Sequence, residues 1–250
     1  MSRAIDLQGD LLKRLDRAFN PRTVAVVGDK GAMGYMWLRA MSTFRGKLYS
    51  VQIDPKEIAG IEELGVPNYS RLTDIPEEID YVLCAVPRQV APHVIADCFE
   101  KGVGAVAMFT SGFAETETEE GIRAQEQITA MAREAGLLVV GPNCMGIYNR
   151  ELGLRQSGDQ PTGDPGNVGF ISQSGTHCIN FALMGQIHGI KCSRTVSIGN
   201  AVVLDAPDYL EFLASDAETE VIGIYLEGVR DGRRLVRVLR ETALRKPVVV

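Results

Sequence analysis

The stretch at residues 24–37, VAVVGDKGAMGYMW, decides the fold, because a buried strand, a glycine-rich turn and the start of a helix follow one another in it. Glycines at 28, 31 and 34 let the backbone approach a phosphate closely, and a helix start presents N–H groups and the positive end of the helix dipole. The spacing G-x-x-G-x-x-G differs from the G-x-G-x-x-G of dinucleotide enzymes. The stretch therefore fits either a nucleotide-type ligand or a tight turn without one.

The same order of apolar strand, polar turn and helical segment runs through the first half of the chain. Strands are predicted at 23–28, 47–53, 81–86, 105–110 and 137–141, and helices near 35–43, 89–101 and 117–135. Nearly continuous apolar strands that alternate with helices are typical of a parallel sheet covered on both faces. We therefore predict that residues 1–147 form a Rossmann-like, doubly wound α/β domain.

A second α/β domain is predicted for residues 148–250. Residues 148–166, YNRELGLRQSGDQPTGDPG, are polar, rich in glycine and proline and without periodicity, which indicates a linker or a long loop. Strands are then predicted at 167–172, 194–199, 221–228 and 246–250, with helices at 176–188, 206–215 and 232–244. Because the last strand coincides with the end of the chain, we expect this domain to be incomplete at its carboxyl end.

Composition and charge narrow the class of protein. A formal net charge of −6 argues against a nucleic-acid-binding surface. The amino terminus lacks the continuous apolar core of a signal peptide, and no later segment is long and apolar enough to span a membrane. The 5 cysteines are scattered, which fits neither a disulfide framework nor a Cys-x-x-Cys metal site. We predict a reduced, cytoplasmic protein without a metal site of its own.

A second candidate site is the stretch NVGFISQSGTHCIN at residues 167–180, in which a strand leads into small polar residues at a helix start. Hydroxyl groups of Ser172, Ser174 and Thr176 and the backbone of Gly175 are expected to surround one point, as in an anion-binding cradle. Ordinary capping of the helix by Ser172 or Ser174 is the alternative. His177 lies in the first turn, where the positive dipole end disfavours an imidazolium, so we predict a packing or hydrogen-bonding role for it.

Three charged residues at strand ends are further candidates. Asp54 follows the second strand, where an acid would hold a ribose hydroxyl in an NAD enzyme. Lys56 could pair with a phosphate there, such as the 3′-phosphate of coenzyme A, or be a solvated loop lysine. Glu227 ends an apolar strand and could orient or deprotonate a ligand in the crevice, or lie on the surface.

Taken in order, several stretches resemble one family. They are GDKGAMG, IDPK, CAVP, KGVGAVAMFTSGFAE, GPNCMG, SQSGT, SIGN, LEG and KPVVV, and they extend from about residue 19 to residue 250. This set is similar to the CoA-binding and ligase-type domains of the NDP-forming acyl-CoA synthetases, the superfamily of the succinyl-CoA synthetase alpha subunit. The resemblance implies a flavodoxin-like second domain. It also implies a reaction in which acid, CoA and NTP give acyl-CoA, NDP and phosphate through an acyl phosphate and a phosphohistidine.

The resemblance also implies roles for single residues. The SQSGT helix start would hold the phosphate carried by the histidine, Glu227 would orient that histidine, and Asn143 of GPNC is a further site residue. The residues that would bind CoA are Gly28, Lys30, Gly31, Ala32, Met33, Gly34, Lys56, Pro87, Thr110, Ser111 and Gly112.

Departures from the family pattern limit what this chain is expected to do. The phosphorylated histidine of the family lies just beyond the KPVVV strand, and none of His93, His177 and His188 matches it. Ser111 stands where the succinyl enzyme has a carboxylate, and Ile179 where it has an aromatic residue, so CoA contacts and acyl preference are expected to differ. The chain alone should bind ligands without completing phosphoryl transfer.

The resemblance further implies partners and leaves alternatives. An ATP-grasp domain or subunit is expected to supply the ATP or ADP with Mg, and the enzyme is expected to be an oligomer that acts on a small carboxylic acid. The alternatives are a non-catalytic CoA-sensing module, a CoA-dependent lyase on the same scaffold, and an NAD-dependent oxidoreductase, which rests on Asp54 alone.

Overall fold

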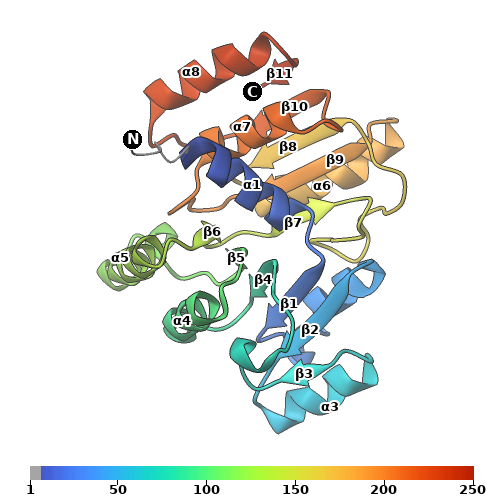
Figure 1. Cartoon of the computed structure of the whole chain (residues 1–250), viewed down its shortest axis with the longest axis vertical. Coiled ribbons are helices and arrows are strands. Elements are labelled where there is room, and N and C mark those ends of the chain that lie inside the picture. Colours follow the sequence, from blue (N-terminus) through green and yellow to red (C-terminus); the bar gives the residue numbers. More distant parts are fainter. Residues whose placement is uncertain (1–6) are drawn as a thin grey trace, which may run out of the picture.

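The computed structural model describes residues 7–250 and contains two sheets, each with helices packed on it. The two sheets follow one another along the long axis of the molecule, with the first sheet at one end and the second sheet at the other (Figure 1). This arrangement confirms the prediction of two successive α/β units.

The first sheet is entirely parallel and has the strand order β3-β2-β1-β4-β5-β6. Its order reverses between β1 and β4, so a crevice is expected outside the carboxyl ends of these two strands, as in other doubly wound folds. The Rossmann-like prediction is thereby confirmed. The strands are β1 (Thr23–Val27), β2 (Lys47–Val51), β3 (Asn68–Tyr69), β4 (Tyr81–Cys84), β5 (Ala105–Met108) and β6 (Leu138–Val140).

The helices of the first unit are α2 (Met36–Ala40), α3 (Pro55–Glu63), α4 (Ala91–Lys101) and α5 (Glu119–Glu134). The helix predicted near 35–43 is short, because α2 gives way to a 3-10 turn, η2 (Met41–Thr43). Neither α3 nor β3 was predicted from the sequence. The strand β3 has only 2 residues, so it offers no alternation for a sequence pattern to detect.

The second sheet is mixed and has the order β11-β10-β8-β9-β7. The strand β7 (Gly146–Asn149) runs antiparallel to β9 (Cys192–Ser197), whereas β8 (Val168–Ser172), β10 (Val221–Tyr225) and β11 (Val248–Val249) are parallel. The strand β7, which begins just before the predicted domain boundary at residue 148, was not predicted from the sequence. That boundary stays a prediction. The helices here are α6 (Gly175–Ile187), α7 (Ala206–Ser215) and α8 (Gly232–Ala243).

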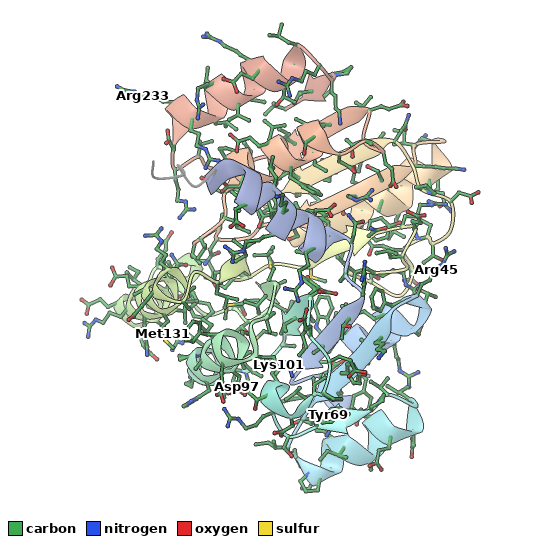
Figure 2. The ribbon with its side chains drawn as sticks, in the orientation of Figure 1. Arg45, Tyr69, Asp97, Lys101, Met131 and Arg233 are labelled. Carbon is green, nitrogen blue, oxygen red and sulfur yellow. The ribbon has the colours of Figure 1, made fainter. Side chains whose placement is uncertain are left out.

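The arginine-rich helix α8 lies at the outer end of the second unit. Arg233 extends from it into solvent (Figure 2). Arg234 instead pairs with Asp208 at 2.7 Å and with Glu211 at 3.0 Å, both on α7. The arginines of α8 are therefore only partly free, because Arg234 attaches α8 to α7.

The first helix of the chain packs against the second unit. Helix α1 (Leu7–Phe19) lies beside α7 (Figure 1), where the rings of Phe19 and Phe212 stack with centroids 4.5 Å apart. Buried side chains from both sheets, such as Val26, Ile171 and Ile222, belong to one continuous apolar cluster. The two units therefore share a core and are not joined only by a flexible connection.

The predicted linker at 148–166 is a long loop, but several of its polar side chains are buried. Gln156 and Gln160 are 0% and 1% exposed, and the side-chain oxygen of Gln160 accepts the backbone N–H of Gln156 at 2.7 Å. Arg155 donates to the carbonyl of Ala40 at 2.7 Å. Buried polar groups are tolerated when they are paired. The polar residues that indicated a linker or a long loop thus include some that fasten this loop between the two units.

Candidate functional site

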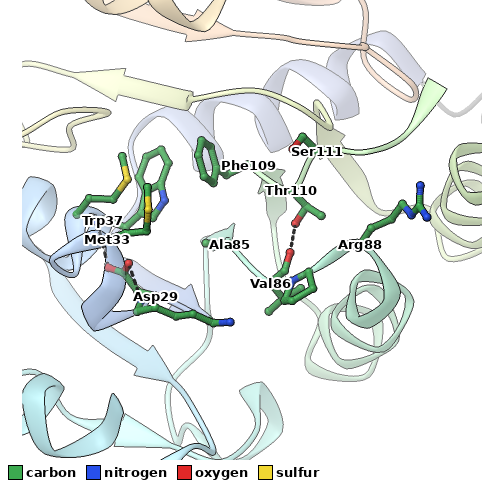
Figure 3. Close-up of a pocket in the computed structure, with 13 residues that line it drawn as sticks. Asp29, Met33, Trp37, Ala85, Val86, Arg88, Phe109, Thr110 and Ser111 are labelled. Carbon is green, nitrogen blue, oxygen red and sulfur yellow. Dashed lines mark hydrogen bonds between the residues drawn. The ribbon is translucent and has the colours of Figure 1, made fainter. Parts of the chain in front are cut away.

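A cavity of about 250 Å³ lies at the carboxyl ends of β1 and β4, where the strand order of the first sheet reverses. Trp37 and Met33 stand on one side of it, Val86 and Thr110 on the other, and Phe109 lies between them (Figure 3). The lining residues are Gly28, Asp29, Lys30, Met33, Met36, Trp37, Ala85, Val86, Pro87, Arg88, Phe109, Thr110 and Ser111.

The structure brings together some of the predicted CoA-binding residues and leaves others outside this cavity. Six of them line it, namely Gly28, Lys30, Met33, Pro87, Thr110 and Ser111. The other members of the set are Gly31, Ala32, Gly34, Lys56 and Gly112, of which Lys56 is exposed at the start of α3. Their contact with CoA stays a prediction.

Thr110 lines the cavity, but its hydroxyl is already used in a hydrogen bond within the protein. Its side chain is 5% exposed and donates to the carbonyl of Val86 at 2.8 Å. Its own carbonyl accepts the N–H of Asn143 at 3.0 Å. Asn143 has a positive φ of 57° and lies in the connection that leads to β7. The role of Asn143 as a site residue stays a prediction, and its observed contact is with the edge of the cavity.

Asp29 lines the cavity but was not among the site residues predicted from the sequence. Its carboxylate accepts the backbone N–H groups of Trp37 at 3.0 Å, Leu38 at 2.9 Å and Lys30 at 3.0 Å. Burial raises the pKa of Asp29, and these hydrogen bonds oppose the increase. The protein's own carboxylate thus already pairs with two N–H groups at the start of α2, where the glycine pattern suggested a ligand phosphate. Lys30, which also lines the cavity and is exposed, provides a positive charge that a ligand anion could contact.

Trp37 and Arg88 also line the cavity and were not predicted from sequence. The indole of Trp37 is 1% exposed, packs edge-on against Phe109 with centroids 5.0 Å apart, and has no hydrogen-bond partner for its Nε1 within residues 7–250. Arg88 donates to the carbonyl of Gly112 and pairs with Glu120. A tryptophan at helical spacing looks like an ordinary core residue, so the sequence gives no signal for Trp37.

Asp54, the residue that suggested an oxidoreductase, is the N-cap of α3. Asp54 accepts the backbone N–H of Lys56 at 3.0 Å at the start of α3. The neighbouring Glu57 accepts the N–H of Gly31 at 2.6 Å and so ties α3 to the glycine loop. Capping accounts for Asp54 without a ribose ligand.

The second candidate site lies at the start of α6. Ser174 is the N-cap, and its Oγ accepts the N–H of His177 at 3.3 Å. Ser172 is fully buried and donates to the carbonyl of Ser174 at 2.7 Å. Thr176 is exposed. The capping interpretation thus holds for Ser174, whereas anion binding by these residues stays a prediction.

Gly175 and His177 have well-defined surroundings at this helix start. A Cβ on Gly175 would come within 2.7 Å of the Cγ of Met145, so a larger residue would require Met145 to move. The ring of His177 packs edge-on against Tyr225, with centroids 4.6 Å apart. This ring contact agrees with the predicted packing or hydrogen-bonding role of His177, although the residue is exposed.

Glu227 lies in the turn that follows β10, next to this helix start. The strands β8 and β10 pair with Ser172 opposite Tyr225, so the segments that continue from them leave the same edge of the sheet. The side-chain oxygen of Gln173 accepts the backbone N–H groups of both Glu227 and Gly228. The structure thus places the turn of Glu227 beside the SQSGT segment.

Glu115 links the rim of the cavity to the second unit. Its carboxylate accepts the N–H groups of Gly112 at 2.6 Å and Phe113 at 3.1 Å, and the side-chain amide of Asn200 at 2.6 Å. Burial raises the pKa of Glu115, but these hydrogen bonds outweigh burial and leave the pKa below its ordinary value. The charged form of Glu115 is therefore favoured in the folded protein.

We expect Glu115→Gln to destabilise the protein at neutral pH by about 1 kcal/mol and to lower the Tm by about 3 °C. A group whose pKa is lowered by folding contributes stability above its unfolded pKa, and this contribution is lost as the pH falls through the folded pKa. The difference from the parent should therefore shrink at acidic pH, once the pH falls below the lowered pKa of Glu115. Thermal unfolding at both pH values measures it, with the exposed Glu126→Gln as the matched control. An equal loss at both pH values would contradict the charged role of Glu115.

Across residues 7–250, no helix is long and apolar enough to cross a membrane. No group of three His, Cys, Asp or Glu side chains in that range could hold a metal ion. All five cysteines are buried as free thiols, and burial raises the pKa of Cys84, Cys98, Cys144, Cys178 and Cys192.

Two family descriptions match successive parts of the chain. Residues 22–150 match the CoA binding domain family, and residues 165–250 match the succinyl-CoA ligase like flavodoxin domain family. The chain is 35% identical over 239 residues to acetate–CoA ligase [ADP-forming] I of Archaeoglobus fulgidus, with 94% of this chain and 34% of that protein covered. It is also 35% identical to the alpha subunit of acetate–CoA ligase [ADP-forming] II of Pyrococcus furiosus, with 94% and 51% covered.

The fold of this chain is also similar to solved structures. A protein of Pyrococcus horikoshii OT3 has a TM-score of 0.84 at 34% identity, with 94% of this chain and 53% of that chain covered. The dinucleotide-forming acetyl-coenzyme A synthetase 1 of Ca. Korarchaeum cryptofilum, in complex with phosphate and ADP, has a TM-score of 0.83 at 34% identity, with 95% and 50% covered. The chain thus spans about a third to a half of the length of these relatives.

Proposed function

Because the chain belongs to the superfamily of the NDP-forming acyl-CoA synthetases, with a CoA-binding domain followed by a succinyl-CoA-ligase-like domain, we propose that it is the part of such an enzyme that binds coenzyme A and holds a phosphoryl group. The complete enzyme would convert acid, CoA and NTP into acyl-CoA, NDP and phosphate. Several relatives are named as ADP-forming ligases of acetate, and another as an ADP-forming ligase of 4-hydroxybutyrate.

The observation that carries this proposal is the cavity at the switch point of the first sheet. Coenzyme A has a negatively charged nucleotide end and a long, uncharged pantetheine arm with apolar stretches. Lys30 supplies a positive charge beside the cavity, and Met33, Trp37 and Phe109 supply an apolar wall. The cavity therefore offers one contact type for each end of the ligand, and its position is the usual ligand position in such sheets.

The remaining parts of the reaction are assigned to other groups. We propose that an ATP-grasp domain or subunit binds ATP or ADP with Mg, because the relatives are longer than this chain and one similar structure holds ADP and phosphate. The SQSGT helix start would hold phosphate, with Glu227 beside it. The acid would be a small carboxylic acid, and the complete enzyme a cytoplasmic oligomer.

We expect coenzyme A to bind this chain and to change the fluorescence of Trp37. Trp37 is the 1 tryptophan of the sequence and lines the cavity, so its emission reports directly on occupancy. At a CoA concentration of about 100 times Kd, binding should stabilise the fold by about 2.7 kcal/mol and raise the Tm by about 5 to 10 °C. Fluorescence titration and calorimetry measure these two quantities.

NAD, tested under the same conditions, serves as the control ligand. A nicotinamide enzyme should respond to NAD at least as strongly as to CoA, whereas the proposed function requires a response to CoA only. If CoA left both the emission of Trp37 and the Tm unchanged, the cavity would not be the CoA site.

A further inference from the structure

Gln173 joins two segments that the proposed function needs close together. Its backbone N–H donates to the carbonyl of Tyr225 at 3.0 Å, so the pairing of β8 with β10 extends one residue beyond the strands. Its side-chain oxygen then accepts the N–H groups of Glu227 and of Gly228, the latter at 2.8 Å. One partly buried residue therefore holds the turn after β10 through its main chain and its side chain.

The turn held in this way has few other attachments. Residues 227–230 are exposed, and a Cβ on Gly228 would meet nothing within 4 Å. Further along, Arg230 donates to the carbonyl of Val202 at 3.2 Å and lies 3.6 Å from Asp205. At Glu227 and Gly228 themselves, the backbone N–H groups are held by the side chain of Gln173. The position of the Glu227 backbone should therefore depend strongly on this one side chain.

We propose that Gln173 is a positioning residue that fixes Glu227 against the helix start at residues 174–176. This proposal deepens the proposed function, because it assigns the residue that makes Glu227 and the phosphate cradle one rigid unit. Gln173 precedes the N-cap Ser174 directly, so any shift of the helix start is transmitted to the turn of Glu227.

The amide chemistry of Gln173 suits a position beside an anion. A carboxamide oxygen accepts two N–H groups without adding charge, whereas a glutamate would accept them equally well but would repel a bound phosphate. Glutamate at position 173 should therefore keep the geometry of the turn and weaken phosphate binding. A methionine of similar length should keep the volume and lose the acceptor.

Amide hydrogen exchange of the parent chain and its variants tests the positioning directly. In Gln173→Met, exchange at Glu227 and Gly228 should become about tenfold faster, because both amides lose their acceptor. In Gln173→Glu, the protection should return. The exposed Gln127→Met on α5 is the matched control and should leave both amides unchanged. Equal exchange in the parent and in Gln173→Met would overturn the proposal.

Binding of inorganic phosphate tests whether Gln173 acts through Glu227. Glu227→Gln removes a negative charge and should strengthen phosphate binding about threefold in the parent, but have little effect in Gln173→Met, where the turn is no longer held. Additive effects in this double-mutant cycle would contradict an action through Glu227. Gln173→Glu should weaken phosphate binding about fivefold.

The two measurements separate this proposal from the proposed function. If the parent chain bound no phosphate, the phosphate cradle of the proposed function would fail, and the exchange rates would still decide whether Gln173 holds Glu227. If phosphate bound but the exchange rates did not respond to Gln173→Met, the positioning role would fail while the cradle stood.

Discussion

Phe19→Ala is expected to destabilise the protein by about 4 kcal/mol, which is a large part of the stability of an ordinary domain. Phe19 is fully buried at the end of α1. Its ring stacks on Phe212 and meets Tyr209 edge-on at 6.4 Å, and both partners belong to α7. Alanine would leave a cavity between the first helix of the chain and the second unit, and the surrounding side chains can close it only partly.

Urea denaturation followed by circular dichroism measures this loss, and the fluorescence of Trp37 adds a probe in the first unit. Because one apolar cluster spans both sheets, the loss of packing near α7 should shift the Trp37 transition as well. Phe99→Ala, at a phenylalanine of α4 that is 62% exposed, is the matched control and should change the stability by less than about 0.5 kcal/mol. A normal Trp37 transition in Phe19→Ala would show that the two units unfold independently.

Lys30→Glu is expected to weaken CoA binding about thirtyfold. Lys30 lines the cavity from the glycine loop, and the carboxylate of Asp29 already occupies N–H groups at the start of α2. A pair of unit charges about 4 Å apart in water is worth about 1 kcal/mol, so charge reversal removes one attraction and adds one repulsion, about 2 kcal/mol in total. Titration of the Trp37 emission with CoA gives the Kd.

The matched control for this variant is Lys191→Glu, at an exposed lysine in the loop before β9. The same charge change there should leave the Kd within about twofold of the parent at physiological salt. Lys56→Glu tests whether the ligand extends out of the cavity to α3, as the family resemblance implies. An unchanged Kd would remove Lys56 from the site, and a parent-like Kd in Lys30→Glu would remove Lys30.

The connections between segments distant in sequence depend on geometry that no local pattern contains. The glycine pattern at 28–34 fitted either a ligand-binding loop or a tight turn, but it did not predict that Asp29 would pair with the amides of Trp37 and Leu38. Glu115 and Asn200 are hydrogen-bonded although they are 85 residues apart in the chain. Gln173 and Glu227, 54 residues apart, meet only because β8 and β10 are neighbours.

The sequence by itself determined the α/β class, the two successive units and the family, because strand and helix periodicity and the order of short motifs are local properties of the chain. Only the tertiary structure decided that α1 packs against α7 of the second unit, that Trp37 lines the cavity, and that Gln173 holds the turn of Glu227. The reason is physical. Periodicity shows which face of an element is buried, but the partner of that face, and of each buried polar group, is chosen by the packing of the whole chain.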